Sequence, residues 1–413
     1  MRSLSALSEH ATLRHQVQPP ADSLGPWKGL PALRPSGKGL PAHEDWTEHL
    51  GTGARLLLLT NDREEGLALG PVEGFEALAD SGQLGSVSAI SHAAGNSRAA
   101  THARVIAALK DQCPDVILVW TGTMYPATAQ QEEELAPLLS SRRVLFWEGD
   151  AWGGRKVHTQ ASKWWLRRTD LAFSVAGEPQ LSMLASMGAR QVQLIPHTYS
   201  HIQFAAAEDA PPPPPDLCRL DAVLMGGNYA RIPGITGLPG SAARYRLAAW
   251  MRLALGDRFR AYGVGWPRWL SNGSIPYSRQ IDCLRSARLS VNWDHYPSHE
   301  GYASDRLAIS LLSGRPQVTT LHPKMDWAPD ESLGLFQEPS VRAVRRRALG
   351  LLADDPEALH MKALDGWKWV RNRMSNKQGA QFMMSMAVDT VPALPFEPWT
   401  RLPKPLVATS SKG

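Results

Sequence analysis

The sequence predicts an α/β protein built from two domains, each with a parallel sheet. Short apolar runs bounded by polar residues recur along the chain, and such runs are typical of buried strands in parallel sheets. Amphipathic helical patterns lie between the runs, and this alternation predicts sheets covered by helices. Five consecutive prolines, Pro211 to Pro215, separate two such series, because they can continue neither a helix nor a central strand.

Composition excludes several classes of protein. The chain has 413 residues, of which 43% are hydrophobic and 20% charged, as in an ordinary globular protein of two or three domains. Three cysteines are too few for a disulfide scaffold or a zinc ribbon. No stretch approaches the roughly 18–20 apolar residues of a membrane span, and no early apolar run suggests a signal peptide. We therefore expect a cytoplasmic protein without a membrane span.

The first domain is expected over residues 51–205. Residues 1–50 are predicted to be a disordered leader, because prolines alternate with glycines and the apolar residues show no regular spacing typical of a helix or a strand. A helix is predicted to end at Gly188, a residue type that favours the C-terminal turn. Strands are expected at residues 55–60, 115–120, 143–147, 171–175 and 191–195.

A proline-rich linker over 206–217 leads to a second domain over 218–390, and a loose tail is expected over 391–413. The second series repeats the alternation of apolar runs and helical patterns. Strands are expected at residues 221–225, 258–262, 288–292 and 316–320, and helices at 244–255, 341–353, 356–373 and 376–388.

The most informative stretch runs from residue 298 to residue 316. Ser304 is expected to cap a helix that Gly314 and Pro316 end. This helix would follow a strand and a Glu-Gly loop, a geometry that suits an anionic ligand such as a diphosphate. Arg306, in the first turn, would add a positive charge.

This stretch resembles a known signature. Glu300-Gly-Tyr, followed by the helix and Ser313-Gly-Arg-Pro, looks like the nucleotide-sugar signature of GT-B glycosyltransferases. More narrowly, Ser304-x-Arg306 and the Gly314 turn are similar to the spore-maturation-protein type, with its family 1/4-like C-terminal domain. The resemblance covers about residues 221–375, whereas the N-terminal half matches only in its α/β pattern. It implies two Rossmann-like domains facing across a cleft, the first binding an acceptor and the second a nucleotide sugar.

The resemblance implies a hexosyl- or pentosyltransferase that uses a nucleotide-diphosphate sugar, UDP-sugar above others, without a tightly bound metal. Glu300 is a candidate catalytic residue, which would contact the sugar or phosphate region of this sugar donor. A second Glu, eight positions later in the family, usually grips the ribose, but Ala308 stands there in this chain. The nucleotide therefore stays open. The residues expected around the sugar donor are Gly226, Gly227, Asn228, His197, Tyr262, Trp266, Gly301, Tyr302, Ser304 and Arg306.

The first domain is expected to bind the acceptor. A reaction that inverts the anomeric centre needs a base for the acceptor hydroxyl, whereas a retaining reaction needs none. Glu148 and Asp150 follow a strand and are the candidate catalytic carboxylates. Aromatic rings nearby could stack on a sugar or a base. The residues expected around the acceptor are Asp62, Trp120, Trp147 and Trp152.

Two questions stay open at this level. The acceptor could be a small molecule or a modified DNA base, as in phage-type DNA glycosyltransferases; the net charge of +5, the pI near 9.1 and the Trp-rich basic segment at residues 163–168 favour DNA. Alternatively, the chain could be a non-catalytic nucleotide- or nucleic-acid-binding protein on a degenerate GT-B scaffold, as Ala308 suggests.

Overall fold

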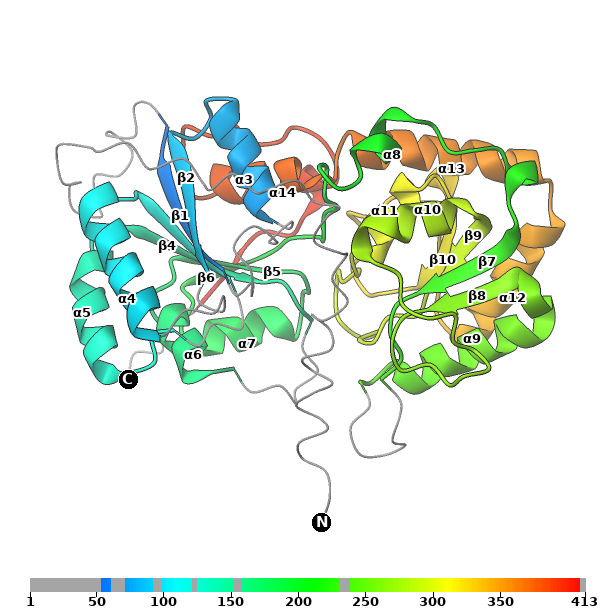
Figure 1. Cartoon of the computed structure of the whole chain (residues 1–413), viewed down its shortest axis with the longest axis horizontal. Helices are drawn as coiled ribbons and strands as arrows, with labels where there is room; N and C mark the ends of the chain where they lie inside the picture. The colour runs from blue at the N-terminus through cyan, green and yellow to red at the C-terminus, as the bar shows by residue number, and fades with distance from the viewer. Residues whose placement is uncertain are drawn as a thin grey trace, which may run out of the picture.

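The computed structural model describes residues 53–60, 71–91, 98–120, 125–151, 158–229 and 238–408. Two sheets, each flanked by helices, form two halves that lie side by side (Figure 1). The strands pair in parallel except for one short strand at the end of the chain, which confirms the predicted α/β class with two parallel sheets. The predicted leader, residues 1–50, lies outside the described residues.

The first sheet has seven strands in the order β12-β6-β5-β4-β3-β1-β2. The five strands predicted for this half are present, with small shifts at their ends. The sequence missed β2, in which three serines interrupt the apolar pattern. The strands are β1 (Arg55–Thr60), β2 (Ser86–Ser91), β3 (Val116–Trp120), β4 (Arg143–Glu148), β5 (Leu171–Ser174), β6 (Gln191–Leu194) and β12 (Leu406–Val407).

Both faces of this sheet are buried, which explains its continuous apolar runs. In β1, Leu56 and Leu58 pack against α3 and α14, whereas Leu57 and Leu59 pack against the helices of the opposite face. The helices of this half that come before β6 in the chain are α3 (Pro71–Asp80), α4 (Arg98–Ala107), η3 (Ala108–Gln112), α5 (Ala129–Leu139), α6 (Gln160–Leu166) and α7 (Gln180–Ser186).

The second sheet has five parallel strands in the order β11-β10-β9-β7-β8. Helices α9 and α12 cover one face, and α10, α11 and α13 cover the other. The strands are β7 (Leu220–Met225), β8 (Phe259–Tyr262), β9 (Ala287–Val291), β10 (Gln317–Thr320) and β11 (Leu335–Glu338). The helices are α9 (Ser241–Leu255), η5 (Gly256–Arg258), η6 (Tyr277–Arg279), α10 (Gln280–Arg285), α11 (Arg306–Leu312), η7 (Glu331–Leu333), α12 (Val341–Ala353) and α13 (Pro356–Arg371).

Helix α11 differs from the prediction at its start. Asp305 occupies the N-cap position, and no side chain caps the helix. The hydroxyl of Ser304 is buried and has no hydrogen-bond partner within the described ranges. Gly314 follows the helix with φ +67, as predicted, because a left-handed residue is favoured after the C-cap.

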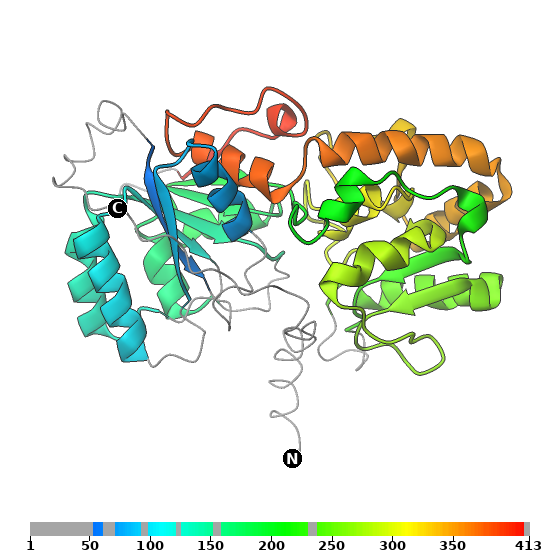
Figure 2. The same ribbon diagram turned by 45° about the horizontal axis from the view of Figure 1, so that its top comes forward.

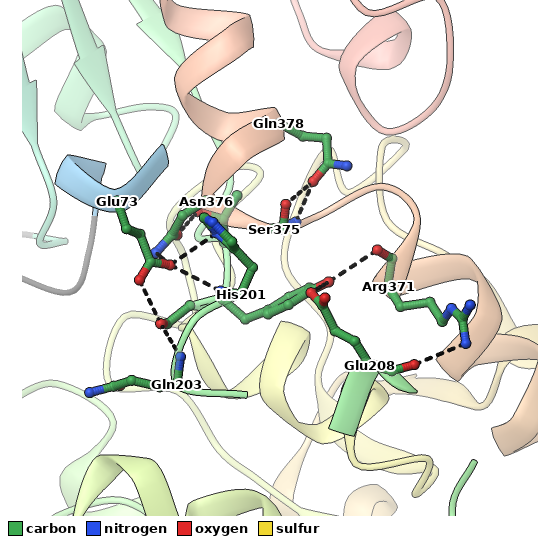
Figure 3. Close-up of polar contacts among 11 residues, drawn as sticks. Glu73, His201, Gln203, Glu208, Arg371, Ser375, Asn376 and Gln378 are labelled. Atoms are coloured by element: carbon green, nitrogen blue, oxygen red, sulfur yellow. Dashed lines mark hydrogen bonds and ion pairs between the residues drawn. The ribbon is translucent and has the colours of Figure 1, made fainter. Parts of the chain in front are cut away.

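The chain crosses between the halves twice, and the two crossings pair with each other (Figure 3). The backbone N–H of Tyr199 donates to Met374 O at 3.1 Å, and the N–H of Asn376 donates to Tyr199 O at 2.9 Å. The buried carboxylate of Glu73, on α3, accepts hydrogen bonds from Ser200 Oγ (2.8 Å), His201 N (2.9 Å) and Asn376 Nδ2 (2.9 Å). We call Glu73, Ser200, His201 and Asn376 the crossing clamp. It ties both crossings to the first half.

The C-terminal segment returns to the first half. Helix α14 (Asn376–Ser385) packs against α3, as Figure 2 shows, and β12 pairs with β6. Val391, Leu394 and Trp399, in or near η8 (Trp399–Arg401), are buried in the same core. The sequence placed residues 376–390 in the second domain and expected a loose tail from 391. Both assignments are wrong for the described residues up to 408, because their apolar side chains cover the first sheet.

The proline linker packs against the second half. It includes α8 (Ala205–Asp209) and η4 (Pro215–Leu217). Arg285 Nη2 donates to Ala210 O at 2.7 Å, and a Cβ on Gly314 would lie 2.2 Å from Pro212 Cγ. The linker therefore has a fixed path along the second half. Within the described ranges, no helix combines the length and apolar character needed to cross a membrane.

Candidate functional site

The carboxyl ends of the two sheets meet where the halves touch. Gly177, after β5, donates its N–H to Glu300 O at 2.7 Å, and Glu300 N donates to Glu178 O at 3.0 Å. A Cβ on Gly177 would lie 2.7 Å from Glu300 O, so this approach requires glycine. Ligands of parallel α/β sheets bind beyond the carboxyl ends of their strands. The predicted residues around Glu300 and around β4 therefore lie at one junction, and Gly177 is a part of it that the sequence did not reveal.

Two arginines converge on the turn after β7. Gly226 has φ +128, and a Cβ there would lie 2.9 Å from Arg306 Nε and 3.2 Å from Arg244 Nη1. Arg306 begins α11, whereas Arg244 projects from α9 and is 2% exposed. Arg244 is the residue of this turn that the sequence missed, because nothing in its helix distinguishes it from the surface arginines nearby.

Arg244 is held by hydrogen-bonding groups other than carboxylates. Its Nη1 donates to Gly227 O at 3.0 Å and lies 2.9 Å from His295 Nε2, and its Nη2 donates to Asn292 Oδ1 at 2.6 Å. No carboxylate of the described residues forms an ion pair with it, whereas Arg306 pairs with Asp305 at 2.8 Å. The Nε atoms of both arginines are buried without a hydrogen-bond partner in the described part of the chain.

The electrostatics of this pair favour an anion. Burial, and then repulsion by Arg306, lower the pKa of Arg244 to about 10. The guanidinium of Arg244 therefore stays charged at neutral pH, although burial disfavours its charged form. Asp305 raises the pKa of Arg306 and outweighs the effect of burial. Two adjacent positive charges, that of buried Arg244 and that of half-buried Arg306, with one contacting carboxylate on Arg306, form a site that negative charge would stabilise.

A polar network behind Arg244 holds it in place. Asn292 Nδ2 donates to Asp294 Oδ1 at 2.9 Å, and His322 Nε2 lies 3.1 Å from Asp294 Oδ2. Burial alone would raise the pKa of Asp294, but the hydrogen bond and charge of His322 and the charge of Arg244 lower it below the usual value. Asn292 thus hydrogen-bonds to both the Asp294 carboxylate and Arg244 and connects the two side chains. Asn292, Asp294, His322 and Ser304 line a small cavity beside this network.

The predicted aromatic loop after β8 packs against the turn that follows β7, at Gly226. Trp266 is buried, and its Nε1 donates to Gly226 O at 3.0 Å. A Cβ on Gly263 would lie 2.6 Å from Gly226 O, and Asn228 N donates to Val264 O at 2.8 Å. Trp266 therefore positions the turn rather than offering a free face. Tyr262 is half-buried, and burial raises its pKa.

His197 and Tyr302 lie where the halves meet. Their ring centroids are 6.5 Å apart, and Tyr302 packs against Val175 and Ala176 of the first half. Burial lowers the pKa of His197, against the opposing charges of Asp305 and Asp150, so its imidazole is neutral at neutral pH. A neutral imidazole can donate one hydrogen bond and accept another.

Glu300 contributes both backbone and side chain. Its Oε1 lies 2.9 Å from Lys324 Nζ, and Gly301, with φ +56, donates its N–H to Pro323 O at 2.7 Å. Trp327 Nε1 donates to Gly301 O at 3.1 Å. Ala308 is buried in α11 and offers no polar atom beyond its backbone.

The two candidate carboxylates after β4 differ in environment. Glu148 is 0% exposed; its Oε1 accepts the N–H of Asp150 at 3.1 Å, and its Oε2 lies 4.0 Å from His158 Nε2. Asp150 is exposed, and its carbonyl accepts Gln180 Nε2 at 2.9 Å. Its negative charge acts on both His197 and Tyr302. Asp150 is therefore the carboxylate that an incoming ligand can reach.

Two of the four predicted acceptor residues lie together. The rings of Trp120 and Trp147 are 4.7 Å apart at an interplanar angle of 43°. A Cβ on Gly149 would lie 3.3 Å from Trp147 and 3.4 Å from Trp120 Nε1, so the small residue leaves room beside both rings. Asp62 and Trp152 lie outside the described residues. Among the residues that the structure describes, no cluster of three or more His, Cys, Asp or Glu side chains could hold a metal ion.

No family model matches the sequence, and no curated protein matches it. Solved structures do. An alpha-glucosyltransferase in complex with UDP and a 13-mer DNA containing an HMU base has a TM-score of 0.55 at 9% identity, covering 82% of this chain and 99% of that one. Sucrose-phosphate synthase from Thermosynechococcus elongatus has a TM-score of 0.52 at 13% identity, covering 81% and 98%. The narrower likeness to the spore-maturation-protein type stays a prediction. At these identities the similarity establishes the fold alone, and that fold is the GT-B glycosyltransferase-like arrangement that the sequence predicts.

Proposed function

We propose that this protein is a glycosyltransferase that moves a hexosyl or pentosyl group from a nucleotide-diphosphate sugar to an acceptor hydroxyl. The observation that carries the proposal is the convergence on Gly226 of buried Arg244 and half-buried Arg306, whose Nε donors have no hydrogen-bond partner among the described residues. A diphosphate supplies the negative charge and the acceptor oxygens that this arrangement lacks. UDP is the nucleotide of choice, since proteins of the same fold have been solved with UDP bound.

The residues at the junction of the halves then have the following roles. The diphosphate lies against the backbone of Gly226 and Gly227, held by Arg244 and Arg306. Glu300 and Tyr302 border the sugar, and the neutral imidazole of His197 hydrogen-bonds a sugar hydroxyl or a phosphate oxygen. Ala308 gives the ribose no carboxylate, so the ribose hydroxyls are bound by other groups or by water.

The reaction requires one bond to form and one to break. The acceptor oxygen attacks the anomeric carbon, the bond from that carbon to the diphosphate breaks, and the diphosphate leaves with its added charge. Arg244 and Arg306 stabilise this charge, which grows in the transition state. In an inverting reaction the hydroxyl proton passes to Asp150, because the alternative, Glu148, is fully buried and accepts the backbone N–H of Asp150.

The acceptor meets the first half at the indole pair of Trp120 and Trp147. Paired indoles stack well on flat rings. A hydroxyl on a modified DNA base is the finer form of the proposal, supported by these rings and by the DNA bound to an alpha-glucosyltransferase of the same fold. A base within a duplex would have to leave the stack to reach the site.

Two experiments test the proposal. First, thermal unfolding is followed with UDP, GDP, dTDP, ADP and CMP, with and without Mg²⁺ or Mn²⁺. A ligand at about 100 times its Kd adds roughly 2.7 kcal/mol to the stability, enough to raise Tm by a few degrees. Second, transfer from the responding nucleotide's sugar conjugates is assayed with wild type, Asp150→Asn and Glu148→Gln. Asp150→Asn should abolish an inverting transfer while leaving nucleotide binding intact.

The rival reading is a non-catalytic nucleotide- or nucleic-acid-binding protein on a degenerate scaffold. It predicts a nucleotide response without turnover for any sugar conjugate or acceptor. If folded protein responds to none of the nucleotides, the role given to Arg244 and Arg306 is wrong.

A further inference from the structure

The second half carries a strongly one-sided charge. Between Asp221 and Asp282 the sequence holds eight arginines and a single acidic residue, Asp257, for a net charge of +7. Residues 339–353, which include α12, hold four arginines and no acidic residue. The whole chain carries only +5, so the rest of the chain is net negative. The positive charge is therefore concentrated in these two segments.

The two segments lie together in space. Helices α9 and α12 pack against each other on one face of the second sheet (Figure 1). Each follows a strand of that parallel sheet, β7 or β11, so each begins at the edge that faces the first half. Arg244, two residues before the exposed Arg246, reaches Gly227 from this end of α9. The charged surface thus starts beside the candidate site.

The surface arginines of this region form two groups. Arg252, Arg258, Arg279 and Arg347 each form an ion pair with a carboxylate. Five others are exposed and form no ion pair with any described residue; with one aromatic residue they make what we call the basic face. Its members are Arg246, Arg268, Trp269, Arg342, Arg345 and Arg346. Like charges held on adjacent helices repel each other, and an anionic partner would relieve that repulsion.

The aromatic residue points to the kind of partner. Trp269 is 50% exposed and stands beside Arg268, with its ring 6.5 Å from Tyr245 in an edge-on arrangement. An exposed aromatic ring among arginines is typical of surfaces that hold a phosphate backbone and stack a base. Arginine also suits phosphate better than lysine does, because its planar fork binds two oxygens at once.

A lipid surface fits this face less well. A helix that lies in a membrane interface needs an apolar stripe beside its basic one. Helices α9 and α12 are described in full, and Leu253 is the one large apolar side chain exposed on them. It follows that charge, not apolar area, dominates this face.

We infer that the basic face binds the phosphate backbone of a nucleic acid and guides it to the junction of the halves. The inference rests on the proposed function and deepens it, because it makes a nucleic acid the carrier of the acceptor hydroxyl. The binding itself requires no sugar donor and no turnover, so it can be measured separately.

The test measures the affinity of the full chain for a labelled DNA duplex and a labelled single strand over a series of salt concentrations. Each phosphate contact contributes about 0.9 to the slope of log K against log salt for a duplex, so Arg345→Gln/Arg346→Gln should reduce that slope by about 2. Lys110→Gln/Arg219→Gln is the matched control, since it removes two exposed charges elsewhere. Trp269→Ala should weaken single-strand binding by roughly 5- to 150-fold.

Three results would overturn the inference. The first is that wild type binds neither nucleic acid at low salt. The second is that the control double variant reduces the slope as much as the Arg345/Arg346 variant does. The third is that anionic phosphatidylserine vesicles bind the protein while both DNAs do not. UDP-induced stabilisation, measured on the same samples, tells the two proposals apart. Its absence in wild type counts against the proposed function. The salt slopes alone decide whether the basic face binds nucleic acid.

Discussion

Replacing Arg244 by glutamine tests the buried anion site most directly. The substitution removes a charge that the fold holds at a cost. Because the pKa falls from 12.5 to about 10, the folded state disfavours the charged form by about 3 kcal/mol, at 1.36 kcal/mol per pH unit. The substitution also removes charge-assisted hydrogen bonds to Gly227 O and Asn292 Oδ1, worth about 1.5–3 kcal/mol each. The two effects oppose each other, so the free energy of unfolding should fall by only about 0–3 kcal/mol.

The same substitution should weaken ligand binding, because no opposing gain offsets the lost contact. A diphosphate loses at least one charge-assisted contact, worth about 1.5–3 kcal/mol, which corresponds to a roughly 10- to 150-fold rise in Kd. Titration calorimetry with UDP measures the affinity, and urea unfolding without ligand measures the stability.

Arg315→Gln is the matched control. Arg315 is equally buried, at 2% exposure, and burial lowers its pKa too, but it lies beside the linker and donates to Arg285 O at 2.8 Å. This variant should lose stability and keep its UDP affinity. If Arg244→Gln binds UDP as wild type does while losing more than about 4 kcal/mol of stability, Arg244 serves only the fold and not the anion site.

Three further changes test other parts of the structure. Glu73→Ala removes the acceptor of three donors of the crossing clamp, two of which are buried, so the urea-unfolding free energy should drop by roughly 3 kcal/mol or more, whereas Glu76→Ala on the same helix should cost far less. Gly177→Ala should speed amide exchange at Glu300, since its Cβ would press on Glu300 O; Gly350→Ala, in open space on α12, should instead stabilise by about 0.5–1 kcal/mol. Asp294 has a folded pKa below its unfolded value, so the stability from its carboxylate is present at neutral pH and is lost as the pH falls below about 4. In Asp294→Asn the free energy of unfolding should depend less on pH in that range. If its pH dependence below about pH 4 equals that of wild type, the Asp294 carboxylate does not stabilise the fold in this way.

Local pattern was sufficient for most of the fold. The run Leu56–Leu59 is buried on both sides of β1, and a fully apolar run predicts that placement from sequence alone. Gly314 ends α11 with a positive φ, as its position after an apolar stripe indicates. Strand β11 was missed because four residues, two of them polar, carry too little periodicity to stand out.

The site was predicted only in part. Glu300, Gly226 and Arg306 belong to segments whose order along the chain is informative, and the structure brings them to one edge of the second sheet. Arg244 could not be singled out, since its burial depends on how α9 packs over the turn after β7. Trp266 was expected to face a ligand but lies under that turn, because its indole N–H satisfies the carbonyl of Gly226.

Most strands and helices follow from the sequence alone, since apolar periodicity and turn residues act within a few positions of each other. Tertiary structure alone decided which sheet each segment covers and which distant groups meet. The amphipathic pattern of α14 predicts a helix with one apolar face, yet only packing against α3 assigns that face to the first half. The crossing clamp joins Glu73 to Asn376 in the same way. Such contacts depend on the closure of the whole chain, because a buried carboxylate is stable only where the complete fold supplies its donors.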